Sequence, residues 1–218
     1  MTQPTENRVV VIDDHPLFRK GVADLINMEP ALTLVGEAAD GESGIRVVQE
    51  TDPDLILLDL NMRGMNGLET LQRLRQDAID ARIVMLTVSD TEDDVIAALR
   101  AGADGYLLKD MEPEDILDCL RRATDGHLVI SERLGELLAR ILRNDSRPPQ
   151  PGDAGLTPRE LEILGLIAKG FSNKLIAREL GLSVGTIKVH VKHILKKLKL
   201  KSRVEAAVWA INSGTDRR

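Results

Sequence analysis

Residues 54–61 read Asp54-Leu55-Ile56-Leu57-Leu58-Asp59-Leu60-Asn61 and carry the main evidence for the fold. A short apolar run bounded by polar residues favours a strand that is buried on both faces, as the strands of a parallel sheet are. Asp59 then stands at the carboxyl end of this strand, the edge where open α/β sheets bind ligands. A lone carboxylate there is more often a strand-end or helix-capping residue than a ligand. Its role therefore depends on what the other strands bring to the same edge.

The first part of the chain alternates between apolar runs and helical patterns. Besides the quoted stretch, strands are predicted at residues 8–12, 33–37, 82–87 and 105–109, and a helical pattern follows each one. This alternation favours an α/β fold with a parallel sheet and helices on both faces, because a crossover between parallel neighbours needs a helix. All the carboxyl ends of the strands then meet at one edge.

The predicted strand ends carry complementary chemistry. They bring together the carboxylates of Asp13, Asp14 and Asp59, the Thr87 hydroxyl and the Lys109 ammonium. Clustered carboxylates favour a hard divalent cation such as Mg²⁺, and a carboxylate can attack a phosphoryl group to give an aspartyl-phosphate. The sequence therefore predicts Asp59 as the nucleophile, with Mg²⁺ and Lys109 balancing the charge of the transition state.

These residues, together with Tyr106 in Gly105–Lys109, resemble the receiver domains of response regulators. The resemblance implies a flavodoxin-like, five-stranded sheet in the order 2-1-3-4-5 and phosphorylation of Asp59. It implies a switch pair, in which Thr87 moves toward the phosphoryl group and Tyr106 packs inward behind it. The implied Mg²⁺ ligands are Asp14, Asp59 and the carbonyl of Asn61, with Asp13 acting partly through water.

Two residues depart from the usual receiver pattern. Arg63 stands where receivers usually carry proline, so the loop after the acceptor is expected to be looser or differently charged. Asp110 follows Lys109 where receivers usually have a cis proline. A cis bond before a residue other than proline costs roughly 2.5–4 kcal/mol, so either a trans bond with altered loop geometry or a strained bond is expected.

The charge distribution predicts two domains with different partners. The net charge is −6, but residues 1–154 hold 16 Lys and Arg against 30 Asp and Glu, a net −14. Residues 155–218 hold 13 against 5, a net +8, which suits a polyanion such as nucleic acid. Proline and glycine in residues 144–155 indicate a linker. The predicted division is a receiver domain at 7–127, a helix and linker at 128–155, and a DNA-binding domain at 156–214.

The sequence also indicates the compartment of the protein and excludes an intrachain disulfide. It has no apolar stretch of membrane-spanning length and no apolar signal region at its start, which predicts a cytoplasmic protein with no membrane contact. Its one cysteine, Cys119, lies in a helical pattern and excludes an intrachain disulfide.

The basic part has the pattern of a helix-turn-helix. Two helical segments meet at Gly181-Leu182-Ser183, and the helix after this turn has an apolar stripe opposite a face of one charge sign. A solvated charged face is the alternative. His190 and His193 could in principle bind a metal ion, but no carboxylate or cysteine stands nearby, so contact with phosphate or solvent is favoured. The residues of the predicted DNA-binding face are Lys188, Val189, Lys192, His193 and Lys196.

Residues 156–160, 186–192 and 204–207 resemble LuxR-type DNA-binding domains, and with the receiver they resemble the NarL/FixJ family over nearly the whole chain. The resemblance implies that Lys188, Val189 and Lys192 reach base edges in the major groove. It implies a homodimer on double-stranded DNA through a helix that carries Val204, Val208 and Trp209. Such a dimer predicts inverted half-sites about one helical turn apart.

The main hypothesis is a two-component transcription factor rather than an enzyme. A sensor histidine kinase would phosphorylate Asp59, which would release the DNA-binding domain from masking by the receiver. Resemblance to the nitrate/nitrite regulators of the family points to nitrate- and nitrite-responsive promoters. One alternative is a Mg²⁺-dependent phosphatase, but position 61 holds Asn61 instead of the expected second carboxylate. The other is a DNA-binding protein with a degenerate receiver, which the complete set of strand-end residues disfavours.

Overall fold

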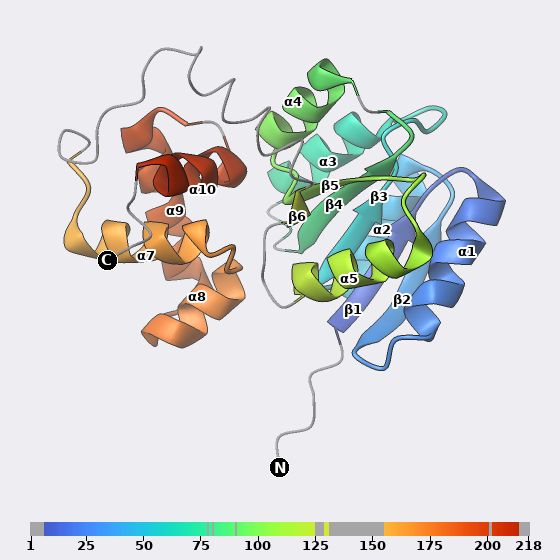
Figure 1. Cartoon of the computed structure of the whole chain (residues 1–218), viewed down its shortest axis with the longest axis horizontal. Helices are drawn as coiled ribbons and strands as arrows, with labels where there is room; N and C mark the ends of the chain where they lie inside the picture. The colour runs from blue at the N-terminus through green and yellow to red at the C-terminus, as the bar shows by residue number, and fades with distance from the viewer. Residues whose placement is uncertain are drawn as a thin grey trace. The chain divides into compact units, whose positions relative to one another are not determined.

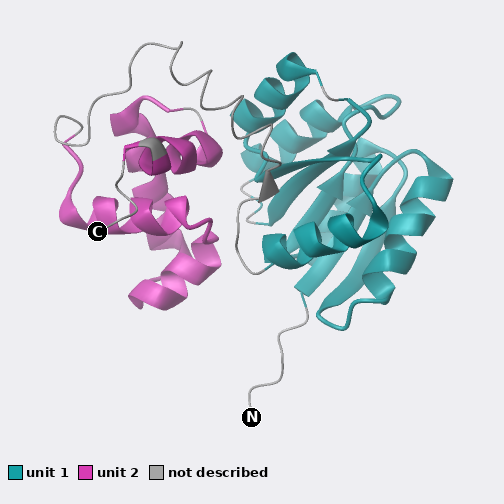
Figure 2. Cartoon of the chain, viewed as in Figure 1, with its two compact units in different colours: residues 1–125 teal, residues 126–218 magenta. Residues whose placement is uncertain are grey.

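The structure, a computed structural model, describes residues 7–77, 79, 81–89, 91–124, 129–130, 155–200 and 202–213. It divides into two units, residues 1–125 and 126–218, and each is described by itself (Figure 2). The predicted helix at 131–142 and the linker at 144–154 lie outside the described residues. No helix within the described ranges has the length and apolar character needed to cross a membrane.

The first unit is an α/β sandwich around one sheet (Figure 1). Its strand order is β2-β1-β3-β4-β5-β6, and the register of β1 to β5 is parallel throughout, so the five-stranded order 2-1-3-4-5 is confirmed. β6 was not predicted, since two residues are too few to show a pattern. The strands are β1 (Asn7–Ile12), β2 (Leu32–Ala38), β3 (Leu55–Leu58), β4 (Arg82–Thr87), β5 (Gly105–Leu108) and β6 (Val129–Ile130).

Helices cover both faces of this sheet (Figure 1). α1 contacts α5, while α2, α3 and α4 pack in series. The residues of β3 and β4 are all buried, which explains why their sequences are continuous apolar runs rather than alternating ones. The helices are α1 (Pro16–Asn27), α2 (Gly41–Thr51), α3 (Gly67–Gln76), α4 (Glu92–Ala101) and α5 (Pro113–Thr124).

The start of α3 lies directly against the end of β3. Asn66 caps the helix in a capping box with Glu69. A Cβ atom on Gly67 would lie 2.0 Å from the carbonyl oxygen of Asp59 and 2.7 Å from the Cα of Leu60. Glycine at position 67 therefore allows the backbone of α3 to approach the residue that sequence analysis singled out.

The second unit is a small helical domain. Its elements are α7 (Pro158–Ala168), α8 (Asn173–Leu180), α9 (Val184–Leu198) and α10 (Arg203–Asn212). Thr157, Ser172, Ser183 and Ser202 each accept a hydrogen bond at the start of one of these helices, so every helix begins at a capping side chain. The core joins apolar residues from all four helices, and it contains Trp209, the single tryptophan of the chain.

A buried ion pair ties α9 to α7. Lys197 Nζ lies 2.7 Å from Glu160 Oε2, and it also donates to the carbonyl of Gly155. Burial alone would raise the pKa of Glu160, but hydrogen bonds from Lys197 and from the backbone and hydroxyl of Thr157 together hold that pKa below its usual value. The carboxylate thus completes the cap of α7 and anchors α9.

Gly67→Ala is expected to destabilise the first unit by about 1–3 kcal/mol, because the new methyl group overlaps backbone atoms that cannot rotate away. Urea unfolding followed by circular dichroism measures the loss. Gly21→Ala in α1 is the matched control, since a Cβ there meets nothing within 4 Å. It should be neutral or stabilising by up to about 1 kcal/mol. Equal effects of the two variants would contradict the close approach.

Lys197→Met is expected to destabilise the second unit by about 1–3 kcal/mol at neutral pH, because Glu160 stays buried without its cation. The depressed pKa of Glu160 contributes stability above its unfolded value of about 4.5, and this contribution is lost as pH falls through the folded pKa. The difference between variant and wild type should therefore shrink in acid.

Trp209 fluorescence during urea unfolding reports on this unit specifically. Lys196→Met, a change at an exposed neighbour, is the control and should leave the midpoint unchanged. A pH-independent loss in Lys197→Met would contradict the assigned role of Glu160.

Candidate functional site

Three carboxylates meet at the carboxyl ends of β1 and β3. Asp13 and Asp14 follow β1, and Asp59 follows β3. Ligand atoms of these residues and of His15 all lie within 4.8 Å of one another. Asp13 and Asp59 are each only 2% exposed, so burial as well as mutual repulsion opposes their negative charge. The predicted convergence of these strand ends is present in the structure.

Lys109 is the cation of this cluster. Its Nζ lies 2.7 Å from Asp13 Oδ2 and 2.9 Å from Asp59 Oδ2, and it also lies 4.8 Å from the centre of the Phe18 ring. Both carboxylates are thereby held by one ammonium group. The Lys109–Asp110 bond is trans, as are the other described peptide bonds, so the departure at Asp110 gives a trans bond in this loop.

The charges of the cluster suit a divalent cation. Asp13, Asp14 and Asp59 against Lys109 leave a formal charge of −2. Asp14 Oδ1 and Asp59 Oδ2 are buried and accept no well-aligned hydrogen bond, although the His15 ring and the Lys109 ammonium lie near them. Oxygen ligands with spare lone pairs and a deficit of two positive charges are what a hard divalent ion requires.

The hydroxyl of Thr87 lies at the same edge and is fully buried. It accepts a hydrogen bond from the backbone of Ser89 at 3.2 Å, and the Asn61 amide lies 3.4 Å away. Tyr106, 1% exposed, donates its hydroxyl hydrogen to the carbonyl of Ser89 at 2.9 Å. Ser89 therefore links Thr87 to Tyr106, a connection that the sequence did not indicate.

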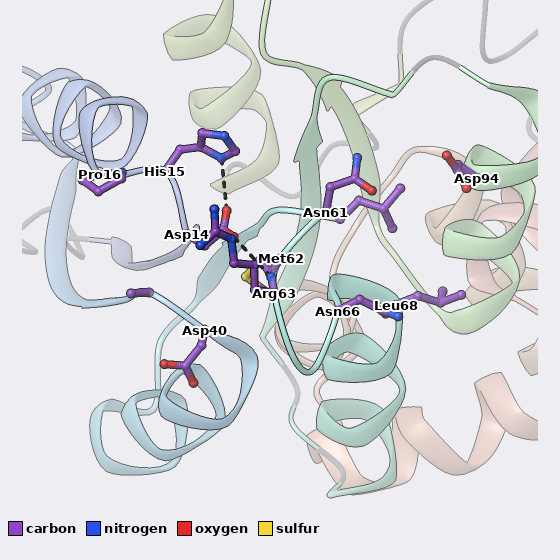
Figure 3. A pocket seen from close by; sticks show the side chains of 12 residues that line it. Asp14, His15, Pro16, Asp40, Asn61, Met62, Arg63, Asn66, Leu68 and Asp94 are labelled. Carbon is purple, nitrogen blue, oxygen red and sulfur yellow. Dashed lines mark hydrogen bonds and ion pairs between the residues drawn. The ribbon is translucent and has the colours of Figure 1, made fainter.

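An open pocket of about 910 Å³ lies in front of the cluster. Figure 3 shows Asp14 at its centre, with dashed lines to His15 and to Arg63. The His15 Nδ1 atom lies 3.1 Å from Asp14 Oδ1, and the Arg63 backbone donates to Asp14 Oδ2 at 3.2 Å. The pocket is lined by Asp14, His15, Pro16, Ala39, Asp40, Leu60, Asn61, Met62, Arg63, Asn66, Leu68 and Asp94.

In the second unit, α8 and α9 meet at a turn where Gly181 has φ +63° and Ser183 caps α9. The stripe Ile187, Ile194 and Leu198 is buried in the domain core. The predicted DNA-binding residues lie off this stripe: Lys188 is half-buried, Val189 is 53% exposed, and Lys192, His193 and Lys196 are exposed. The lysines thus line a continuous face of α9.

The residues of α10 divide between two faces. Trp209 belongs to the domain core together with Ala206 and Ala210. Val204 and Val208 are one turn apart and lie outside that core cluster, yet they too are buried, at 0% and 9% exposed, whereas Ile211 is 50% exposed. Ile211 was not among the residues expected for a dimer contact.

Sequence reasoning missed His15, Ser89 and Ile211. His15 follows the aspartates directly, so its place beside them was available from adjacency. Ser89 acts through its backbone, which no residue pattern reveals. Ile211 could have been found from its spacing of three and seven residues from Val208 and Val204.

Comparisons with known proteins match both units. The family described as response regulator receiver domain matches residues 9–121, and the family described as bacterial regulatory proteins, luxR family, matches residues 154–210. The chain is 58% identical to the nitrate/nitrite response regulator protein NarL of Escherichia coli (strain K12), over 92% of this chain and 93% of that protein.

It is 46% identical to the nitrate/nitrite response regulator protein NarP of the same strain, over 95% and 96% of the two chains. Among solved structures, the two-component response regulator RcsB in a complex with DNA covers 96% of this chain and 99% of its own, with 25% identity and a TM-score of 0.57. With this arrangement of receiver and helix-turn-helix, the chain belongs to the NarL-like response regulators, the DNA-binding transcription regulators of two-component systems.

Proposed function

We propose that this protein is switched between weak and strong DNA binding by phosphorylation of Asp59. The observation that carries the proposal is the placement of Asp59, buried beside two further carboxylates and 2.9 Å from the Lys109 ammonium. A sensor histidine kinase is the proposed donor. Relatedness to NarL and NarP supports nitrate- and nitrite-responsive promoters as the targets.

The acidic cluster is proposed to hold Mg²⁺ through Asp14, Asp59 and the carbonyl of Asn61, with Asp13 acting partly through water. When bound, the ion would neutralise charge on the phosphoryl oxygens. The chain's own residues do the rest. Asp59 supplies the attacking oxygen, Lys109 fixes that carboxylate and compensates its charge, and the backbone N–H of Asn61 donates to Asp59 Oδ1 at 3.3 Å. Each group is already positioned, so little reorganisation precedes attack.

The switch pair is proposed to be Thr87 and Tyr106. A phosphoryl group on Asp59 would offer acceptor oxygens for the Thr87 O–H, and moving the hydroxyl toward them would break the bonds that its oxygen now accepts from Ser89 and Asn61. Tyr106 shares Ser89 as its partner, so a change at Thr87 would reach the tyrosine. The phosphoryl group would act by favouring one of two arrangements of Thr87 and Tyr106.

The DNA-binding unit is proposed to bind inverted half-sites as a homodimer. Lys188, Val189 and Lys192 would reach base edges, since lysine can donate to guanine and valine can meet a thymine methyl group. His193 and Lys196 would lie toward phosphates. Ile211, 50% exposed, would offer an apolar side chain to a second copy, next to Val204, Val208 and Trp209 of the same helix, which are buried in this structure. The net charges of −14 and +8 support masking of this unit by the unphosphorylated receiver.

With BeF₃⁻ and Mg²⁺, the wild-type protein is expected to bind a selected promoter duplex at least about tenfold more tightly, a coupling of about 1.4 kcal/mol. Asp59→Asn should bind equally with and without BeF₃⁻. Asp54→Asn, which removes a carboxylate from the opposite end of β3, is the control and should respond like wild type. Fluorescence anisotropy of labelled DNA measures all three. An unchanged affinity of the wild type on activation contradicts the switch.

Lys192→Ala and Lys196→Ala are expected to weaken DNA binding in different ways. Losing a base contact at Lys192 should cost about 1–3 kcal/mol on the preferred site and reduce discrimination against mutated sites. Losing a phosphate contact at Lys196 should weaken binding to all sequences alike and reduce the slope of log K against log salt by roughly 0.9 per contact. Lys169→Ala, an exposed lysine outside α9, is the control. Identical sequence dependence of the two α9 variants would contradict the assignment.

A further inference from the structure

The pocket beside Asp14 and Asn61 is acidic apart from one arginine. Asp14, Asp40 and Asp94 line it, and its histidine, His15, is already paired with Asp14. Arg63 also lines the pocket and is exposed. Within the described ranges, no carboxylate lies within ion-pair distance of its guanidinium group. An arginine among three aspartates that pairs with none of them is available for an external anion.

The backbone fixes Arg63 at this place. Its N–H donates to Asp14 Oδ2, which holds residue 63 beside the carboxylate cluster. Gly64 follows with φ +75°, a left-handed conformation that turns the chain away immediately after the arginine. The loop is therefore anchored by its backbone, while the exposed side chain of Arg63 lines the pocket.

The direction of phosphoryl transfer relates the position of Arg63 to the path of the leaving group. In an in-line transfer the leaving group departs opposite the attacking oxygen. Asp59 does not line the pocket itself, but its neighbours Leu60 and Asn61 do, and so does Asp14, whose carboxylate lies within 4.8 Å of that of Asp59. We therefore take the pocket as the side from which a donor enters and the leaving group departs. Arg63 therefore borders the region through which the leaving group passes.

We propose that Arg63 forms a subsite for the carboxylate leaving group of small acyl phosphates. This rests on the proposed phosphorylation of Asp59. The Asp59 oxygen forms a bond to phosphorus, the bond between phosphorus and the acyl oxygen breaks, and the electron pair stays on that oxygen as a carboxylate. No proton is needed. Negative charge grows beside Arg63, which binds it more strongly in the transition state than in the donor.

A donor with a phosphorus–nitrogen bond gains nothing from this subsite, because its nitrogen is protonated before it leaves and departs as a neutral amine. Arg63 is thus a specificity-determining residue that favours acyl phosphates over nitrogen donors. Arg63 contacts the leaving group of the donor, whereas the acidic cluster and Lys109 bind the phosphoryl group.

The test compares two donors on the full chain with Mg²⁺, by phosphate-affinity electrophoresis of the phosphorylated protein. With acetyl phosphate, Arg63→Gln should be slower by about three- to tenfold, the loss expected for one partly exposed charge-assisted hydrogen bond. With phosphoramidate, the change should stay within about twofold. Arg63→Lys keeps the charge and should recover most of the acetyl phosphate rate. Arg46→Gln removes an exposed arginine that does not line the pocket and should change neither rate.

Three results would overturn the proposal. Equal losses with both donors would mean that Arg63 acts on the phosphoryl group. A loss that vanishes in about 0.5 M salt would mean that it only attracts anions from a distance. A parallel loss of BeF₃⁻ affinity would mean that the acceptor site itself is disturbed, since BeF₃⁻ has no leaving group. If neither donor labels wild type, or Asp59→Asn is still labelled, the proposed phosphorylation of Asp59 fails instead.

Discussion

The first unit depends on holding like charges together at the end of a buried sheet. Asp13 and Asp59 are nearly inaccessible to water, yet they share one edge with Asp14. Lys109 makes this arrangement possible, because a single ammonium group contacts both buried carboxylates. It does not neutralise the set, and the remaining charge of −2 is what the proposed Mg²⁺ would balance. The parallel topology places these residues, since only it brings the ends of β1, β3 and β5 to one edge.

The features of this arrangement that could be predicted from the sequence are those that follow from the burial of the strands. β3 and the Ile83–Leu86 run of β4 are apolar because both faces of these strands are covered, so the strand ends, and hence Asp59 and Thr87, could be located. The relation between Thr87 and Tyr106 was available only through resemblance. The structure connects them through backbone atoms of Ser89, and backbone atoms carry no residue-specific signal. β6 escaped prediction because two residues have no periodicity.

The second unit shows a different limit of sequence reasoning. Both faces of α10 are apolar, so hydropathy alone cannot tell which face packs in the core and which could meet a partner. Trp209, Val204 and Val208, the residues predicted for a dimer contact, are all buried in this structure, and the contact itself stays a prediction. Ile211, which was overlooked, is half-exposed. By contrast, the capping side chains of Thr157, Ser172, Ser183 and Ser202 were recognisable, because a cap is a local interaction between neighbouring residues.

The hydrogen bonds that link Thr87, Ser89 and Tyr106 limit the free energy that the proposed switch can use. Each of these neutral hydrogen bonds contributes on the order of 1 kcal/mol net, so moving Thr87 toward a phosphoryl group costs about that much unless Ser89 finds another partner. Hydrogen bonds to a doubly charged phosphoryl group are about twice as strong as neutral ones. The free energy gained by bonding the phosphoryl group therefore exceeds the free energy lost at Ser89 by a small amount. This amount corresponds to the 1–3 kcal/mol typical of coupling between sites. The proposed switch, built on such a margin, would be partly populated in both states, so residues that shift its balance would tune the basal level of DNA binding as well as the response.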